Sequence, residues 1–430
     1  MTHPIRRAAM AVAAVLASAG ALQAQDPNAA NDAIRIGITY QPGTRPGLVV
    51  VPTSGAEAAR DILKRDLDYS DRFQMIEAGA GGAGSGGTFN YAYYRTQFGA
   101  QHAVEVVPAA GGVTVRLHDL STSKVRNQAT VALPPEGSAG YRMAVHRAAD
   151  EVVRWATGTP GYAASRIVYL SGGRLYRIDS DGEDNTTVTP AGQSAFSSAW
   201  APDGRRIAYM RLESGSIMVM DLATGATEAV PGTTTGQNYA PAFSPDGRVV
   251  AYARSEEGGA TNIFSANIAE RCCVQRLTVR GFALNLSPSF SPDGRRIAFV
   301  SNRAGSSQIY VMAASGTDQE LLVPYEYGSS GPSYAPEWSP DGANVVFHRE
   351  VSRSPQIFLF DVASQRVKQL TSIGRSEDAT WAPDGRHIAF VSDRTDRRQL
   401  WVVDTETGRV RQLNTAGAAR IPSWSRRLGG

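Results

Sequence analysis

A five-residue pattern, repeated along the second half of the chain, constrains its fold most strongly. An aromatic residue, then Ser or Ala, then Pro-Asp-Gly occurs five times, with the glycine at Gly204, Gly247, Gly294, Gly342 and Gly385. Successive glycines are 43, 47, 48 and 43 residues apart. A period of about 40 to 50 residues indicates an array of supersecondary units. Helical repeats are excluded, because Pro-Asp-Gly interrupts every unit and no 3.6-residue apolar stripe is present.

Each unit has the pattern of a propeller blade. Pro presets the first central position of a turn, and Gly adopts the positive φ that closes it. Strand-length runs rich in β-branched and aromatic residues follow, for example at 295–301, 308–313 and 319–323. Four short antiparallel strands per unit, including the strand that carries the aromatic, make a blade. We expect the repeated aromatics to be wedged between neighbouring blades.

The number of blades follows from the two ends of the repeat region. Runs at 166–170, 174–179 and 185–189 match the second, third and fourth strands of a blade that lacks its first strand. The last run, 420–425, carries a sixth aromatic, Trp424, and matches a first strand with nothing after it. Pairing these segments hides two sheet edges. The sequence therefore predicts an all-β six-bladed propeller closed by a C-terminal latch strand.

The first 24 residues have the features of a secretory signal peptide. Arg6 and Arg7 precede a short apolar run at 8–19, and small residues follow as far as Ala24. We expect cleavage after Ala24, with Ala21 as the alternative. The apolar run is too short for a permanent membrane helix, and no other segment approaches 18 apolar residues. The mature protein is therefore expected to be exported and to carry no transmembrane segment.

Residues 25–160 are predicted to form an α/β domain, followed by the propeller at 161–430. Helices are expected at 55–67 and 140–156, where apolar residues recur at helical spacing, and a further helix is expected at 89–98. Strands are expected at 34–38, 48–51, 73–76, 103–107, 113–118 and 124–133. The boundary is placed at Thr159-Pro160-Gly161.

The composition does not point to catalysis or to nucleic-acid binding. Removing Arg6 and Arg7 from 43 basic residues leaves 41 against 40 acidic ones, a net charge of +1, without a basic block. Residues 79–84 match G-x-G-x-x-G formally, but more glycine follows instead of a helix, which favours a loop or an insertion. The histidines lack metal-ligand spacing, and His387 is expected on a strand surface. We predict no catalytic residue, metal or cofactor.

The only two cysteines are adjacent, Cys272-Cys273. They are interpreted as a pair in the turn region between the last two strands of one blade. A redox-active vicinal disulfide is the alternative, and the sequence does not decide the state of the pair.

The segments just before each repeated aromatic should surround the central funnel of the propeller. They are varied and contain amide, hydroxyl and aromatic groups, which are suited to protein recognition. They are 193–196, 237–240, 285–287, 334–335, 376–378 and 420.

A signal peptide, an α/β domain and a six-bladed propeller together resemble the TolB family of the Gram-negative Tol-Pal system. Residues 239–247, Tyr-Ala-Pro-Ala-Phe-Ser-Pro-Asp-Gly, are similar to the family repeat, and 421–425, Ile-Pro-Ser-Trp-Ser, to its terminus. The segments Arg-Ile-Gly-Ile at 35–38 and Arg-Pro-Gly-Leu-Val-Val-Val-Pro at 45–52 resemble the family's opening strand and the segment after it.

The resemblance implies a non-enzymatic periplasmic adaptor, monomeric, with two protein partners. The lipoprotein Pal would bind at the funnel rim, and TolA would bind a mobile N-terminal segment. The implied Pal-binding residues are Gln237, Asn238, Tyr239, Ala240, Asn285, Leu286 and Ser287. The implied TolA-binding residues are Ile34, Arg35, Ile36, Gly37 and Ile38. Two alternatives are a secreted propeller that binds another envelope protein or carbohydrate, and a propeller related to peptidases.

Overall fold

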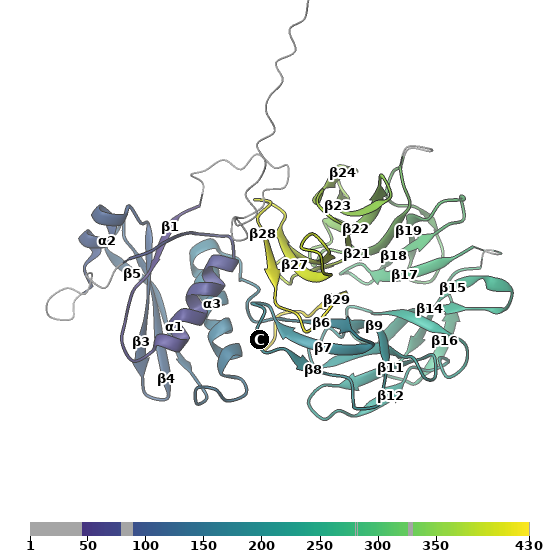
Figure 1. Cartoon of the computed structure of the whole chain (residues 1–430), viewed down its shortest axis with the longest axis horizontal. Helices are drawn as coiled ribbons and strands as arrows, with labels where there is room; N and C mark the ends of the chain where they lie inside the picture. Colours follow the sequence, from purple (N-terminus) through teal and green to yellow (C-terminus); the bar gives the residue numbers. More distant parts are fainter. Residues whose placement is uncertain (1–44, 79–88, 280, 282, 326–329, 430) are drawn as a thin grey trace, which may run out of the picture. The chain divides into compact units, whose positions relative to one another are not determined.

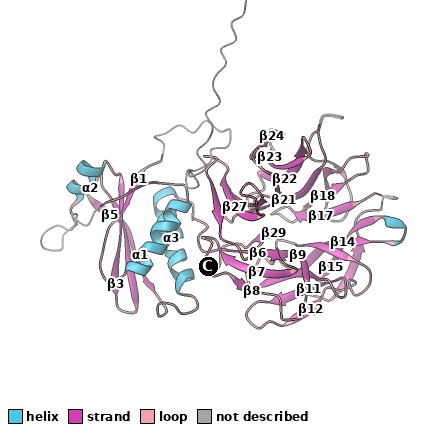
Figure 2. Ribbon diagram, in the orientation of Figure 1, coloured by secondary structure: helices cyan, strands magenta, loops and turns pink. Residues whose placement is uncertain are grey.

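The structure is a computed structural model that describes residues 45–78, 89–279, 281, 283–325 and 330–429. A five-stranded sheet with three helices precedes six four-stranded sheets (Figures 1 and 2). The expected signal peptide, the expected strand at 34–38 and the glycine-rich residues 79–87 lie outside the described residues. None of the described helices is long and apolar enough to cross a membrane.

The first sheet has the order β2-β1-β3-β4-β5, in which β1 is parallel to β2 and β3 and the remaining pairs are antiparallel. Its strands are β1 (Gly47–Val50), β2 (Gln74–Ile76), β3 (His102–Ala109), β4 (Gly112–Asp119) and β5 (Lys124–Ala132). The helices are α1 (Glu57–Tyr69), α2 (Tyr91–Phe98) and α3 (Tyr141–Thr157). All three helices were predicted within one to two residues of these ends.

Helices α1 and α3 cover one face of this sheet because each has an apolar stripe. Ala59, Leu63 and Leu67 of α1 are buried at helical spacing and share a core with Val145 and Val152 of α3. Helix α2 packs on the other face, through Tyr94. The connection from α3 to β6 contains the expected domain boundary, and we propose that the division falls there.

Each of the six remaining sheets is a blade of four antiparallel strands. Blade 1 comprises β9 (Ala195–Trp200), β10 (Arg206–Arg211), β11 (Ser216–Asp221) and β12 (Thr227–Ala229). Blade 2 comprises β13 (Asn238–Phe243), β14 (Val249–Ser255), β15 (Thr261–Asn267) and β16 (Cys272–Arg276). Blade 3 comprises β17 (Asn285–Phe290), β18 (Arg296–Ser301), β19 (Gln308–Ala313) and β20 (Glu320–Leu321).

Blades 4 to 6 repeat this arrangement. Blade 4 comprises β21 (Ser333–Trp338), β22 (Asn344–Val351), β23 (Ser354–Asp361) and β24 (Arg366–Gln369). Blade 5 comprises β25 (Ser376–Trp381), β26 (His387–Ser392), β27 (Gln399–Asp404) and β28 (Val410–Leu413). Blade 6 comprises β29 (Arg420–Trp424), β6 (Arg166–Ser171), β7 (Arg174–Asp179) and β8 (Thr186–Thr187). The first strand of each blade contacts the first strands of both neighbouring blades, so the six blades form a closed ring.

The predicted closure of the ring is confirmed. Strand β29 pairs antiparallel with β6, with Trp424 opposite Ile167 and Arg420 opposite Leu170. Blade 6 therefore combines the last described strand of the chain with the first three strands of the propeller.

The Pro-Asp-Gly turns and the aromatic wedges are also confirmed. The five turn glycines have φ between 66° and 74°, a region that favours glycine. In each turn the Asp carboxylate accepts a hydrogen bond from the backbone N–H two residues on, at 2.8–3.1 Å. Trp381 packs with Val346 of blade 4 and with Phe390 of its own blade 5, and the other repeated aromatics lie between blades in the same way.

Candidate functional site

The direction of the strands separates the two faces of the ring. The first strand of each blade ends at the repeated aromatic and, in blades 1 to 5, at the Pro-Asp-Gly turn. Its beginning therefore lies at the opposite face, together with the loops that join strands two and three and those that lead from one blade to the next. We call this second face the rim. All seven predicted Pal-binding residues lie on it, at or just before the starts of β13 and β17.

A bulge with positive φ lies near the rim in all six first strands. The bulged residues have φ between 40° and 55°, and the pairing register with the second strand shifts there. They are Ser197, Ala240, Ser287, Ala335, Asp378 and Ile421. None is glycine, and such a conformation costs about 1–3 kcal/mol at a non-glycine residue. Because the bulge recurs in all six blades, it is a feature of the propeller fold, and it changes the direction of the side chains near the start of each first strand.

Asn238 and Asn285 are fully buried, and their side chains hold the rim loops in place from the interior of the protein. The Asn238 Nδ2 donates to the carbonyl oxygens of Gly215 and Thr233 at 2.9 and 3.0 Å, and its Oδ1 accepts from Arg254. The amide of Asn285 makes a similar set of hydrogen bonds in the next blade. These two side chains therefore fix the loops, and a partner would touch the residues around them.

The other predicted rim residues are accessible to different degrees. Gln237 is exposed, whereas Tyr239, Ala240, Leu286 and Ser287 are half-buried. The Tyr239 hydroxyl is hydrogen-bonded to that of Ser255. Rigid, partly exposed side chains of this kind are suited to contact with a protein surface.

Most of the exposed large apolar side chains lie in rim segments, a feature that the sequence analysis did not identify. Nine large hydrophobic residues are exposed among the described residues, and six of them are in rim segments, with exposed fractions of 36% to 69%. These six are Phe196, Leu212, Val279, Leu284, Val351 and Ile373. Apolar side chains that are exposed on one face are suited to contact with a protein. A sequence alone shows such residues only as isolated interruptions of polar loops.

Four arginines lie at the rim, one in each of blades 2 to 5. Each lies near the end of the second strand with its guanidinium 4.4–5.7 Å from the centres of two aromatic rings. They are Arg254, Arg303, Arg349 and Arg394. Burial lowers the pKa of Arg394 to about 10, which leaves it charged at neutral pH. The recurring aromatic followed two or four residues later by arginine is a sequence signal that could have identified them.

A cavity of about 610 Å³ opens at the opposite face and is lined by the repeated aromatics and prolines. Glu337 is the acidic residue in this lining, and burial raises its pKa to about 7 even though Trp381 and Thr380 donate to its Oε1. Ser339, also in the lining, is held in its turn by Asp341 at 2.5 Å and by the N–H of Asn344 at 2.9 Å. Its hydroxyl is therefore committed to the turn rather than aligned with a base.

The expected surface position of His387 is wrong. Its side chain is fully buried, with Nδ1 2.7 Å from Asp384 and Nε2 3.2 Å from Asp71. Burial alone would lower the pKa of His387, but the two carboxylates raise it to about 9. His146 on α3 is also buried, 2.7 Å from Asp66 and 3.6 Å from Asp179. Against the same opposing effect of burial, these carboxylates raise the pKa of His146 to about 10.

These histidine clusters have the residue types of metal sites but the charges of ion-pair networks. Asp66, His146 and Asp181 converge, as do Asp71, His387 and Asp404. A protonated imidazole cannot ligate a metal, and arginines already pair with the carboxylates. Arg409 contacts Asp68 and Asp71 at 2.9 and 3.1 Å, Arg386 contacts Asp404 at 2.6 Å, and Arg65 contacts Asp181 at 2.5 Å. We therefore assign both clusters a structural role.

The clusters predict a loss of stability at alkaline pH. A histidine whose pKa is raised on folding stabilises the native state fully below its ordinary value of 6.5, and this contribution disappears as pH rises to the folded pKa. The urea midpoint should therefore fall progressively between pH 7.5 and 9.5. The double variant His146→Gln/His387→Gln should have a lower urea midpoint at pH 7.5, and this midpoint should decrease less steeply as the pH rises. Parallel decreases in both proteins would contradict this assignment.

The closed ring of four-stranded blades and its latch strand define a six-bladed β-propeller, preceded by an α/β domain. The chain belongs to the TolB β-propeller family, because the family model of the TolB β-propeller domain matches residues 154–330 and 325–428.

Individual relatives agree with this assignment. The chain is 30% identical over 181 residues to the Tol-Pal system protein TolB of Chromobacterium violaceum, and 33% identical over 180 residues to that of Aromatoleum aromaticum. These matches cover 39% and 40% of this chain, and only 42% of the length of each relative. The crystal structure of TolB from Acinetobacter baumannii superposes with a TM-score of 0.77 and 25% identity, over 90% of this chain and 98% of that one.

Proposed function

We propose that this protein is a non-enzymatic periplasmic adaptor of the Tol-Pal type, which binds the lipoprotein Pal at the rim. Its TolB relatives are Tol-Pal system proteins. The observation that carries the proposal is that six of the nine exposed large hydrophobic side chains lie in rim segments, because apolar side chains exposed on one face are suited to contact with a protein partner.

The predicted Pal-binding residues then divide into two roles. Gln237, Tyr239, Ala240, Leu286 and Ser287 contact the partner, together with neighbouring apolar residues such as Leu284. Asn238 and Asn285 hold the loops in place through their buried hydrogen bonds. Preformed loops reduce the entropy lost on association.

The second proposed partner is TolA, which binds the N-terminal segment Ile34, Arg35, Ile36, Gly37 and Ile38. Its alternating pattern would allow it to add as a strand to the edge of a partner sheet. This segment lies outside the described residues, so the proposal rests on its sequence and on the family.

Calorimetric titration of residues 25–430 with the soluble domain of the organism's own Pal tests the rim. We expect the variant Gln237→Ala/Leu284→Ser to bind at least about tenfold more weakly, because the loss of central contacts commonly costs more than 1 kcal/mol. Val125→Ser is the matched control, since Val125 is similarly exposed but lies on β5 of the α/β domain. If both variants bound Pal equally weakly, or if neither bound it more weakly than the parent, the Pal site would not lie on the rim.

The parent protein and a deletion of residues 25–38 complete the experiment. The deletion should abolish binding of the TolA domain and leave the Pal titration unchanged. If the parent does not bind Pal, the adaptor proposal fails and a different envelope ligand must be sought. Loss of Pal binding in the deletion variant would instead indicate that the N-terminal segment and the rim form a single binding site.

A further inference from the structure

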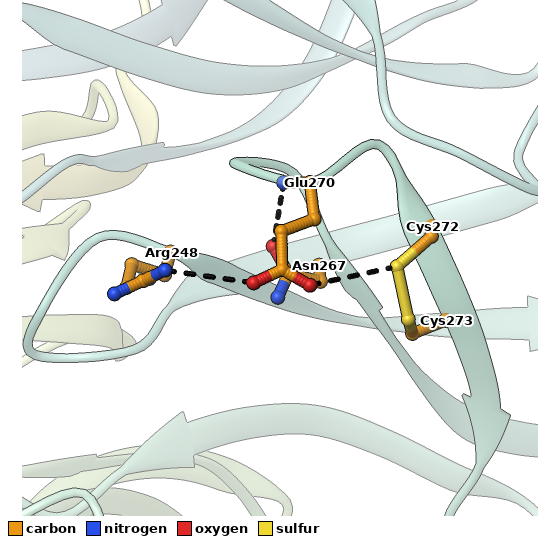
Figure 3. The surroundings of a disulfide bond; sticks show 5 residues. All are labelled: Arg248, Asn267, Glu270, Cys272 and Cys273. Atoms are coloured by element: carbon orange, nitrogen blue, oxygen red, sulfur yellow. Dashed lines mark hydrogen bonds and ion pairs between the residues drawn. A yellow bond between two sulfur atoms is a disulfide. The ribbon is translucent and has the colours of Figure 1, made fainter.

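The two adjacent cysteines form a disulfide in the outer part of blade 2. Cys272 and Cys273 are bonded to each other at the start of β16. Figure 3 shows the pair beside Glu270, whose carboxylate lies 3.9 Å from the Cys272 sulfur and pairs with Arg248 at 3.5 Å. The two cysteines are therefore not free thiols.

The bond lies at an irregularity of the β15–β16 ladder. Gln275 pairs with Ser265 and Cys272 pairs with Asn267, so that Cys273 and Val274 together lie opposite Ala266. Cys273 has a φ of 61°, in the left-handed region that L-residues rarely adopt. The ring closed by neighbouring cysteines restricts this backbone directly. Opening it would make ordinary extended conformations available to Cys273.

The residues around the pair connect blade 2 to both of its neighbours. Towards blade 1, Arg271 pairs with Glu228 at 2.7 Å, and Val274 lies so close to Gly232 that an added Cβ would meet it at 2.8 Å. Towards blade 3, the Gln275 Nε2 donates to the carbonyl oxygen of Ser315 at 3.0 Å. All three contacts are made by residues within two positions of Cys273, so a change in its backbone conformation would displace them together.

The disulfide is also accessible to a reductant. Cys273 is exposed, Cys272 is half-buried, and Cys273 lines a groove of about 490 Å³ together with Pro245 and Phe290. Exposed disulfides are the labile and regulatory ones, whereas buried structural disulfides resist reduction.

We propose that Cys272–Cys273 is a reversible thiol–disulfide site that controls the attachment of the β16 edge to the neighbouring blades. A thiolate of a dithiol reductant attacks one sulfur, forms a mixed disulfide and releases the other cysteine as a thiolate. The second thiol of the reductant then displaces the first cysteine. Two electrons and two protons pass to the pair, the S–S bond is replaced by two S–H bonds, and the reductant becomes a disulfide.

Dithiothreitol treatment of the full folded protein tests this proposal. We expect the intact mass to increase by two hydrogen atoms, and two thiols to become available to a labelling reagent, without a change in far-UV circular dichroism. Amide exchange of residues 271–276 should become about tenfold faster, as expected for a local opening. Exchange of β24, the outer strand of blade 4, should remain unchanged. Oxidised dithiothreitol should restore both the mass and the exchange rates.

The double variant Cys272→Ala/Cys273→Ala is the matched control. Its exchange at residues 271–276 should equal that of the reduced protein and should not respond to dithiothreitol. Reduction that occurs only in denaturant, unchanged exchange after reduction, or failure of reoxidation to restore the original rates would each overturn the proposal. If the variant does not fold, wild-type protein that has been reduced and then alkylated with iodoacetamide serves as the control, because it cannot reform the disulfide.

Discussion

Replacing Trp381 with alanine is expected to lower the free energy of unfolding by about 3–5 kcal/mol. Trp381 is only 4% exposed and fills the space between blades 4 and 5, where it contacts Val346, Ile357 and Phe390. Its indole N–H also donates to the carbonyl oxygen of Glu337 at 3.2 Å. Alanine would leave both a cavity and an unsatisfied buried acceptor, and these penalties add.

Equilibrium unfolding in guanidinium chloride, followed by far-UV circular dichroism, measures this effect. Phe196→Ala is the control, because Phe196 is 37% exposed and belongs to none of the hydrophobic core clusters of the described residues. Its truncation should change stability by less than about 1 kcal/mol. Similar losses from the two substitutions would argue that the aromatic wedges do not stabilise the ring.

The second large effect is expected from Arg386→Leu. Arg386 is 7% exposed and forms a two-pronged pair with Asp404, at 2.7 and 2.6 Å, in a fully buried position. Removing Arg386 leaves the buried Asp404 carboxylate without its two-pronged partner, and the loss of one partner of a buried ion pair commonly costs about 3–5 kcal/mol. The same unfolding measurement applies.

Two further variants separate charge from packing. Adding Asp404→Asn to Arg386→Leu should recover part of the lost stability, because the unpaired carboxylate is then removed. The exposed pair Arg154–Glu151 provides the surface comparison, and Arg154→Leu should change stability by no more than about 0.5 kcal/mol. A double variant less stable than Arg386→Leu would show that packing, rather than the buried charge, dominates.

Most of the fold could be predicted because its determinants are local and repeated. The Pro-Asp-Gly turn requires glycine at positive φ, and this requirement is visible five times in the sequence. The missing first strand of one blade and the unpaired last strand were also visible as an incomplete period. The pairing of β29 with β6 could therefore be predicted from the incomplete period of the repeat, without any knowledge of contacts.

The candidate site was only partly predictable. The sequence located the rim segments, but the positive φ of residues such as Ala240 and Asp378 leaves no signal, since no glycine marks it. Asn238 looks like a surface amide in the sequence and is fully buried in the structure. Its role depends on carbonyl groups in loops that other segments bring to it.

The buried charge networks could not be predicted for a similar reason. Asp71 and His387 meet across 316 positions of the chain, and nothing near either residue indicates the other. His387 replaces the arginine found after other turns, so the sequence favoured a surface position. Long-range ion pairs of this kind become visible only when the fold is known.

The shared blade has a consequence for the order of folding. The hydrogen bond from Arg166 to Ser425 joins residues 259 positions apart, so the ring closes only after nearly the whole propeller sequence is available. Contacts of such separation slow folding, because loop closure precedes the gain from pairing. During this interval β6 presents an unpaired edge that another chain could occupy. The strand that completes the ring thus also protects the newly folded molecule from association with its copies.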